Sequence, residues 1–213
     1  MKKLIILGAS GSSLDILSIV NYINKNSKTF EFIGFLDDNP EKVHEKYKKK
    51  ILGKFKDALS FKNVYFSIGT GNEKNFLNRK NVIKNLNIPI EKFANIIHPT
   101  SIIDENTYIG HGNIIHAYVS ISRDVRINDF VNILPKTTIN HDVNVGSFTI
   151  INSNTTISGN VVIGDCCYLG QGSNIRDHIV INNEILIGMG SVVTKDLKKS
   201  GTYYGVPAKL IRK

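Results

Sequence analysis

Cysteine is scarce in this sequence, and no long hydrophobic run occurs. The two cysteines, Cys166 and Cys167, are adjacent, so they cannot form a framework of disulfide bridges, and a reducing cytoplasm is the simplest compartment. No apolar segment approaches the roughly 18 residues that a membrane helix needs. The first apolar run ends at Leu7 and Asp15 soon follows, so we expect no secretory signal peptide. The sequence therefore predicts a cytoplasmic protein with no membrane insertion.

Acidic residues are outnumbered by basic ones. The chain of 213 residues has 27 Lys and Arg against 18 Asp and Glu, a formal net charge of +9. Such a charge suits nucleic acid, anionic lipid or phosphate-bearing small molecules. The basic residues are mostly scattered lysines with no aromatic interleaving and no nucleic-acid motif. We expect a lysine-rich solvated surface and no nucleic-acid partner, with phosphate-rich cofactors as the alternative.

The first part of the chain alternates short apolar runs with helical patterns. We expect strands over Lys3–Leu7, Phe32–Leu36 and Val64–Ile68, and helices over about Leu14–Asn24 and Glu73–Leu86. Strand, tight turn, helix and strand in this order are typical of a parallel sheet. The sequence therefore predicts a small Rossmann-like α/β domain over residues 1–89.

The remainder, residues 90–213, has a strict period of six. Seventeen consecutive positions from Ile97 to Val193, taken every sixth residue, are all Ile, Leu or Val. Most positions two residues before these anchors are small or β-branched. Turn formers follow many anchors, and we expect them to adopt the left-handed conformation that a corner needs; they are Gly110, Asn128, Asn140, Gly146, Asn152, Gly164, Gly170 and Gly188. A six-residue period excludes an α-helix and a coiled coil, and it predicts an all-β domain, a parallel β-helix of hexapeptide repeats.

Several segments together resemble a known family along the whole chain. They are the opening strand with its GASGSS turn, FLDD after the second strand, SIGTGNEK after the third, the His141-Asp142 pair, SGNVVIG, and the closing GSVVTKDL and YYGVPAKLIRK. In these segments the chain resembles the NeuD/PglD-type bacterial sugar acetyltransferases. The resemblance implies a Rossmann-like domain followed by a left-handed β-helix in which one coil is three hexads. It also implies a homotrimer that binds acetyl-CoA in a groove between subunits and uses no metal.

The best candidate for a catalytic base is His141, because a neutral imidazole titrates near working pH. Asp142 would orient the ring or hold its charge. With three hexads per coil, Gly159 lies one coil after His141 at about 4.8 Å, and its N–H is a plausible oxyanion or thioester contact. Without the family, a His-Asp pair at a corner is an ordinary solvated turn. Relatives often carry Asn where this chain has Leu134 and a second His where it has Ile150, so contacts near the base differ here.

The remaining site residues divide into a cofactor set and a substrate set. Acetyl-CoA, the co-substrate, is expected at the unhindered backbone of Gly170 and Gly188 and in the tail at Ala208 and Lys209, whose GVPAK motif is typical of acetyl-CoA-dependent transferases. The Gly8-Ala9-Ser10-Gly11 loop opens a helix, so its N–H groups suit a phosphate, although a simple βα turn explains it equally. By resemblance the nucleotide of the substrate binds there, with these contacts at strand ends: Gly8, Ser10, Gly11, Asp37, Asp38, Gly69, Asn72 and Lys74.

Three histidines suggest a zinc site as a hypothesis. His98 and His116 are one coil apart and should stack in adjacent coils, with His111 nearby. A catalytic zinc needs three protein ligands, and the sequence places no clear third one, so polar corner residues are the simpler interpretation.

Three functions remain open. The first is an acetyl-CoA-dependent N-acetyltransferase, an acyltransferase for a UDP- or dTDP-linked amino-dideoxy sugar in surface glycan biosynthesis. The second is a sialic acid O-acetyltransferase. The third is a zinc-dependent β-helix enzyme of the carbonic anhydrase kind, or a scaffold without catalysis. A nucleotide-binding domain favours the first, and the GVPAK tail argues against the third.

Overall fold

The computed structural model describes residues 1–212, and Lys213 of the expected second domain lies outside them. The first part is a parallel sheet in the order β3-β2-β1-β4. Its elements are β1 (Lys2–Leu7), α1 (Gly11–Asn26), β2 (Phe30–Leu36), α2 (Glu45–Lys48), β3 (Ile51–Gly53), β4 (Tyr65–Ile68) and α3 (Arg79–Asn85). Short 3₁₀ turns cover Pro40–Lys42, Phe55–Ser60, Phe76–Asn78 and Ile90–Lys92. The Rossmann-like prediction is confirmed.

One helix is shorter than the sequence predicts. The expected helix from about Glu73 to Leu86 starts only at Arg79, as α3, after a 3₁₀ turn. Asparagine side chains compete with helical hydrogen bonding at its start: Asn72 Oδ1 accepts from the Lys74 N–H at 2.9 Å, and Asn75 Oδ1 accepts from the Asn72 N–H at 2.7 Å. The segment after β4 is therefore a loop.

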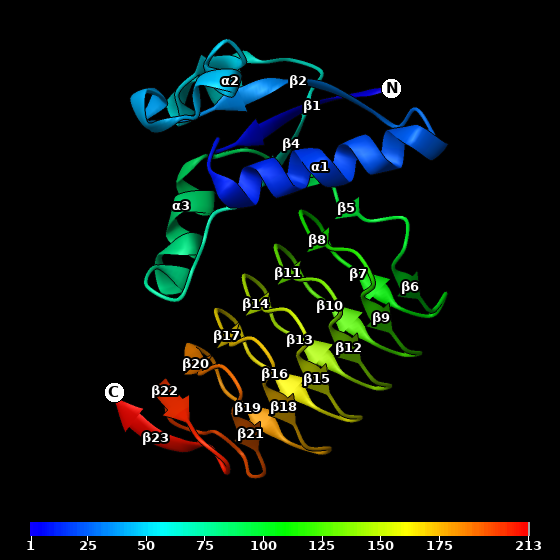
Figure 1. Ribbon diagram of the computed structural model, residues 1–213, viewed down its shortest axis with the longest axis vertical. Helices are drawn as coiled ribbons and strands as arrows, with labels where there is room; N and C mark the ends of the chain where they lie inside the picture. The colour runs from blue at the N-terminus through cyan, green and yellow to red at the C-terminus, as the bar shows by residue number, and fades with distance from the viewer. Residues whose placement is uncertain (213) are drawn as a thin grey trace.

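The second part is a left-handed parallel β-helix whose coils each cross three sheets in turn (Figure 1). The β5 sheet contains β5 (Ile96–Ile97), β8 (Ile114–Ile115), β11 (Asn132–Ile133), β14 (Ile150–Ile151), β17 (Tyr168–Leu169), β20 (Ile185–Ile187), β22 (Gly201–Tyr204) and β23 (Lys209–Arg212). The β6 sheet contains β6 (Ile102–Ile103), β9 (Ser120–Ile121), β12 (Thr138–Ile139), β15 (Thr156–Ile157), β18 (Asn174–Ile175) and β21 (Val192–Val193). The β7 sheet contains β7 (Tyr108–Ile109), β10 (Arg126–Ile127), β13 (Asn144–Val145), β16 (Val162–Ile163) and β19 (Val180–Ile181).

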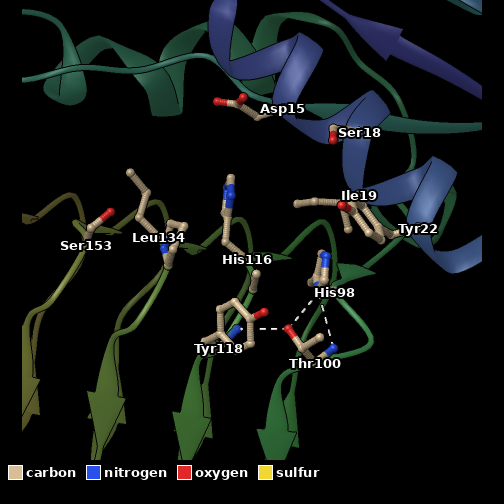
Figure 2. A pocket seen from close by; sticks show the side chains of 12 residues that line it. Asp15, Ser18, Ile19, Tyr22, His98, Thr100, His116, Tyr118, Leu134 and Ser153 are labelled. Carbon is tan, nitrogen blue, oxygen red and sulfur yellow. Dashed lines mark hydrogen bonds between the residues drawn. The ribbon is translucent and has the colours of Figure 1, made fainter.

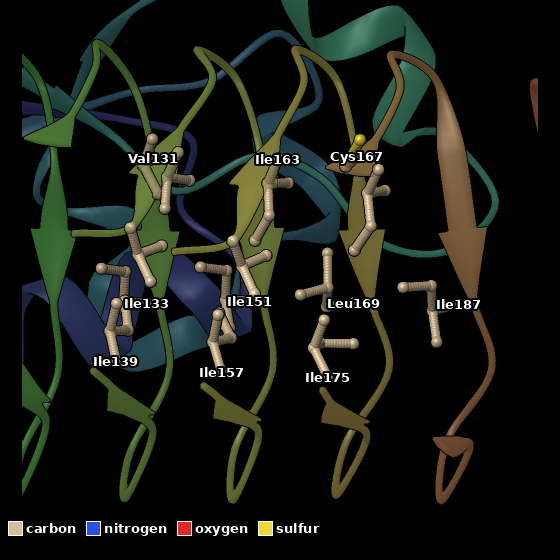
Figure 3. Close-up of a cluster of buried hydrophobic side chains, with 14 of the residues drawn as sticks. Val131, Ile133, Ile139, Ile151, Ile157, Ile163, Cys167, Leu169, Ile175 and Ile187 are labelled. Carbon is tan, nitrogen blue, oxygen red and sulfur yellow. The ribbon is translucent and has the colours of Figure 1, made fainter. Parts of the chain in front are cut away.

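Aliphatic anchors fill the interior of the β-helix, as the six-residue period predicts. From Ile115 onward every anchor is buried, and the apolar residues two positions before them join the same core (Figure 3). In-register pairing such as Ile133 with Ile151 puts each anchor one strand spacing from the equivalent anchor of the next coil. Burial of each such side chain contributes roughly 1.5–3 kcal/mol, so the repeat supplies its own core.

The corners contradict one expectation. Left-handed φ angles occur three residues after the anchors, mostly at non-glycine residues such as Tyr118, Phe130 and Lys136, and not at the turn formers directly after them. Glycine follows an anchor because of close approach: a Cβ on Gly146 would lie 2.3 Å from the backbone of Gly164 in the next coil. At these glycines the space between coils, and not a left-handed φ, accounts for the residue.

An apolar interface joins the two parts. Phe93, Phe130, Phe148 and Cys166 belong to the same buried cluster as Ile5 and other residues of the N-terminal sheet. The Phe130 and Phe148 rings stack with centroids 5.3 Å apart.

Arg79 links the two parts through hydrogen bonds. Its Nε donates to Thr70 O at 2.8 Å and its Nη1 donates to Phe130 O in the β-helix. Burial lowers the pKa of Arg79 to about 10, so the guanidinium keeps its charge at neutral pH. Since a buried charge is costly unless it is bonded, these carbonyls hold the Thr70 loop against the Phe130 corner.

The cysteines offer a test of the fold. Cys166 and Cys167 are free and buried, and burial raises the pKa of both thiols, that of Cys167 to about 12. At pH 8 about one Cys167 in 10,000 is a thiolate, and only thiolates react quickly. We expect no rapid reaction of the native chain with a disulfide reagent, and two thiols per chain after unfolding in guanidinium. Rapid labelling of the native protein would contradict the burial of this corner.

Candidate functional site

His141 lies at the corner between β12 and β13, and its ring covers Gly159 in the next coil. A Cβ built on Gly159 would lie 2.6 Å from His141 Cε1 and 2.9 Å from Nε2, so only glycine admits the imidazole in this position. Because equivalent positions of successive coils pair in register, this stacking follows from the coil length. The predicted neighbourhood of His141 and Gly159 is confirmed.

Asp142 holds the other edge of the imidazole. Its Oδ2 lies 2.7 Å from His141 Nδ1, and both side chains are about half exposed. A carboxylate accepts here, so Nδ1 carries the proton and Nε2 is left as the free basic nitrogen of the neutral ring. The pair is arranged as a general base needs.

The sequence reasoning missed Arg123. Arg123 stands one coil before His141, and its Nη1 lies 2.6 Å from Asp124 Oδ2 and 3.7 Å from Asp142 Oδ2. The Asp124 and Asp142 carboxylates raise the pKa of Arg123, which is exposed. The coil spacing that located Gly159 would also have located Arg123 on the opposite side of His141.

Gly159 also offers a free donor. Among the residues that the structure describes, its N–H donates to no protein group, while its carbonyl accepts from the His178 N–H at 3.1 Å. A backbone N–H beside a basic nitrogen can stabilise an oxyanion while the base takes a proton. This corner therefore has the parts that acyl transfer requires.

The residues expected at the cofactor lie near the last coils. Gly170 and Gly188 line a cavity of about 90 Å³ with Tyr168 and Tyr204. Their backbone is not unhindered, contrary to the sequence prediction. A Cβ on Gly188 would lie 1.9 Å from the Tyr204 ring, and one on Gly170 would lie 2.5 Å from Met189 N, so the protein itself fills the space beside both glycines.

The tail forms a hairpin at this end of the molecule. β22 pairs antiparallel with β23, and the Ala208 N–H donates to Val192 O at 2.8 Å. Lys209 begins β23 and is exposed, while Ala208 packs against the core of the β-helix. The tail is thus attached to the last coil, with the Lys209 side chain in solvent.

The glycine-rich loop lies at the carboxyl end of β1. Gly8 has φ +90°, a conformation that side chains rarely adopt. Ser10 is the N-cap of α1, which begins at Gly11. Asp37 supports this loop, since its Oδ2 accepts from the Ala9 N–H at 2.7 Å. The structure brings these residues together at one edge of the sheet, as expected.

The other expected substrate residues are less concentrated. Asp38 Oδ1 accepts from the Phe55 N–H at 2.9 Å, which braces the 3₁₀ turn after β3. Gly69 packs against α1, where a Cβ would lie 2.9 Å from Ile16 Cδ1. Asn72 shapes the loop after β4, and Lys74 lines a cavity of about 720 Å³ with Glu73 and residues of the tail hairpin such as Tyr204. Lys74 therefore shares a cavity with the tail hairpin.

A further cavity of about 480 Å³ lies between α1 and the corners that follow the β5-sheet strands (Figure 2). His98, His116 and Leu134, at equivalent positions of three successive coils, form its floor, and α1 covers it. Burial lowers the pKa of both histidines, so both are neutral at neutral pH. Ile150 is elsewhere: it is buried under Gly71, whose Cβ would lie 2.8 Å from Ile150 Cδ1.

In the part of the chain that the structure describes, no three His, Cys, Asp or Glu side chains gather as metal ligands. His111 lies at a different corner from His98 and His116, and its Nδ1 is 3.5 Å from Asp129 Oδ1. Among residues 1–212, no helix is both long enough and apolar enough to cross a bilayer.

Within one chain the candidate residues form separate groups. His141, Asp142 and Gly159 meet at the corner between the β6 and β7 sheets, whereas the glycine-rich loop belongs to the N-terminal part and lies at the carboxyl end of β1. The large cavity of α1 opens at a third place, the corner between the β5 and β6 sheets.

Comparison with known proteins matches both parts. Residues 3–86 match the family model of the PglD N-terminal domain, and residues 92–201 match that of the GMPPB C-terminal domain. A search of curated protein sequences gives no match.

Solved structures share the whole fold. The acetyltransferase domain of PglB from Neisseria gonorrhoeae FA1090, also solved with acetyl coenzyme A, is 23% identical with a TM-score of 0.86, and the match covers 99% of this chain and 99–100% of that one. PerB from Caulobacter crescentus, solved with CoA and GDP-perosamine, is 21% identical over 98% of this chain and 97% of its own, with a TM-score of 0.82.

A third structure matches part of the chain. It is an AntD N-acyltransferase variant from Bacillus cereus with dTDP-4-amino-4,6-dideoxyglucose and coenzyme A, 20% identical over 62% of this chain and 88% of its own, with a TM-score of 0.51. With residues 92–201 matched, just over half of its length, the chain belongs to the GMPPB C-terminal domain family, and a PglD N-terminal domain precedes this β-helix.

Proposed function

We propose that this protein is an acetyl-CoA-dependent N-acetyltransferase that acts on a nucleotide-linked amino sugar for surface glycan biosynthesis in the cytoplasm. The observation that carries the proposal is the His141 ring, with Nδ1 held by Asp142 and its Nε2 edge over Gly159 of the next coil. The Rossmann-like domain supports a nucleotide-bearing acceptor, because its strand ends and glycine-rich loop suit a diphosphate. We assign nucleotide binding to residues 1–89 and acetyl transfer to residues 90–213.

The reaction needs one proton acceptor and one oxyanion donor. The sugar amine attacks the thioester carbonyl carbon, and His141 Nε2 takes the proton that the amine loses. The Gly159 N–H stabilises the oxygen of the tetrahedral intermediate. The C–S bond then breaks, the C–N bond remains, and His141 returns the proton to the leaving CoA thiolate. Asp142 keeps Nδ1 protonated throughout and stabilises the imidazolium.

The ligands of similar structures guide the choice of substrate. PerB was solved with GDP-perosamine and AntD with a dTDP-linked 4-amino sugar. We therefore propose a test with UDP-, dTDP- and GDP-linked 4-amino sugars and with sialic acid in parallel, following released CoA with a thiol reagent. An acetylated amine in the product supports the proposal, whereas acetylation of sialic acid alone would favour the O-acetyltransferase.

We propose a homotrimer that joins the separate groups of residues. The outward side of the β6 sheet carries the short side chains of Ser120, Thr138 and Thr156, stacked in register. The N-terminal part packs against the β5 sheet and its corners, through residues such as Ile114 and Phe130, and among the described residues no strand of the β6 sheet belongs to these buried clusters. A closed threefold assembly through this sheet would set the His141 corner of one subunit beside the Leu134 corner of the next.

The assembly has a direct test. One chain has a mass of 23.7 kDa. Analytical ultracentrifugation at micromolar concentration should show a single species with three times this mass. Thr138→Arg, which places a charged side chain at the centre of the β6 sheet, should dissociate it, whereas Asn144→Arg on the β7 sheet should not. A stable wild-type monomer would contradict the joined active site.

Lys209 tests the position of the cofactor. If its exposed ammonium meets the phosphates of CoA, Lys209→Ala should raise the KM for acetyl-CoA about three- to tenfold, as loss of an ion pair in contact with solvent does. The KM for the sugar nucleotide should not change. Lys199→Ala removes an equal charge nearby and should change neither. An equal effect of Lys209→Ala on both substrates would misplace the tail.

His141 tests the chemistry. His141→Asn keeps a hydrogen-bonding group but cannot take the proton of the amine, so kcat should fall about 10²–10⁴-fold with little change in substrate binding. Asp142→Asn should cost less, because the imidazole remains. Steady-state kinetics at neutral pH decide the matter, and near-normal turnover of His141→Asn would exclude this residue as the base.

A further inference from the structure

The residues that line the cavity under α1 have no role in the reaction described above. Asp15, Ser18 and Tyr22 project into it from α1, and His98, His116 and Leu134 line it from three successive coils (Figure 2). Its volume of about 480 Å³ is that of a pocket for a small molecule. The lining combines hydroxyl, imidazole and carboxylate groups with the apolar side chains of Tyr22 and Leu134. Such a lining fits a sugar ring, which has polar hydroxyl edges and an apolar face.

Its charge selects one end of a nucleotide sugar. The lining contains one carboxylate, Asp15, and no lysine or arginine. The nearest cation on α1, Lys25, lies outside the lining, over the Tyr22 ring at 4.5 Å. A diphosphate would meet the Asp15 charge without a counter-charge, which is repulsive. A protonated amine would instead gain a charge-assisted hydrogen bond.

The histidine floor presents fixed, uncharged groups. The Thr100 N–H donates to His98 Nδ1 at 3.2 Å, and Thr100 Oγ1 lies 2.8 Å from the same nitrogen. Nδ1 is therefore an acceptor, and the neutral ring carries its proton on Nε2. Since burial lowers the pKa of His98 and His116, neither ring opposes a cation at neutral pH.

The distance along α1 fits a ligand that begins at the glycine-rich loop. With 1.5 Å per residue, Asp15 lies about 6 Å beyond Gly11 along the helix axis. A diphosphate at the start of α1 would therefore put the attached sugar over Asp15 and Ser18. At the far side of the cavity are Leu134 and Ser153, the corner that the proposed trimer sets beside His141 of a neighbouring subunit.

We infer that this cavity holds the sugar ring of the acceptor and that the Asp15 carboxylate recognises its protonated amine, an inference that rests on the proposed function. Asp15 is thus the residue that distinguishes an amino sugar from the sugar with a hydroxyl at the same carbon. It binds the ammonium, which releases one proton to solvent to become the neutral nucleophile, and His141 then takes the second proton as the amine attacks.

Matched ligand pairs test this assignment without acetyl transfer. Three pairs of ligands serve as probes. They are GDP-perosamine with GDP-rhamnose, dTDP-4-amino-4,6-dideoxyglucose with dTDP-6-deoxyglucose, and UDP-4-amino-4-deoxy-N-acetylglucosamine with UDP-N-acetylglucosamine. Each pair differs only in an amine or a hydroxyl at C4. Isothermal titration calorimetry at pH 7 gives the two affinities for the wild type, for Asp15→Asn and for Glu31→Gln, which removes an exposed carboxylate from the same domain, outside the cavity lining.

For at least one pair, the wild type should bind the amine about tenfold more tightly than the hydroxyl, a ratio expected for one charge-assisted hydrogen bond. Asp15→Asn should bring the ratio close to one by weakening only the amine, and Glu31→Gln should keep it. An unchanged ratio in Asp15→Asn, or no amine preference in the wild type, overturns the assignment and leaves the proposed function standing. Failure of every sugar nucleotide to bind overturns both.

Discussion

Parallel pairing between equivalent positions of successive coils governs the whole structure. Because Thr138 pairs with Thr156 and Asn144 with Val162, every corner lies directly beside the corners of adjacent coils. Side chains far apart in sequence thus form columns along the edges of the β-helix. Arg123, His141 and Gly159 form one column, and His98, His116 and Leu134 form another. A single inserted residue in one coil would break a column, so the uninterrupted period preserves the site as well as the core.

The corner conformation brings the His141 and Asp142 side chains together. Asp142 has φ +59°, one of many non-glycine residues in the left-handed region three positions after an anchor. Such a residue costs roughly 1–2 kcal/mol outside glycine. The buried anchors on both sides, such as Ile139 and Val145, offset that cost. The same turn directs the Asp142 carboxylate back to His141 Nδ1, although side chains of adjacent residues usually diverge in extended backbone. Local strain therefore provides the orientation that a base requires.

The sequence predicts best what the period controls. The buried anchors and the small residues two positions before them follow from spacing, and the contact of His141 with Gly159 follows once the family resemblance supplies three hexads per coil. The left-handed positions do not, because Tyr118, Phe130 and Lys136 carry no turn signal and the visible glycines serve close packing instead. The helix after β4 begins late because of asparagine hydrogen bonds that a hydrophobic pattern does not register.

The cavity under α1 could not be predicted from the sequence, for a different reason. It exists only because the N-terminal sheet docks on the β-helix, through Arg79 and the stacked phenylalanines, and no periodicity encodes that contact. The docking of the two parts also separates positive from negative side chains. The exposed lysines, including Lys74 and Lys209, lie outside the cavity, while Asp15 faces it. A ligand with an anionic diphosphate at one end and a cationic amine at the other is oriented by this separation. For the substrates proposed above, the net charge of +9 would attract their phosphates, and the one carboxylate in the cavity would determine which end of the acceptor enters it.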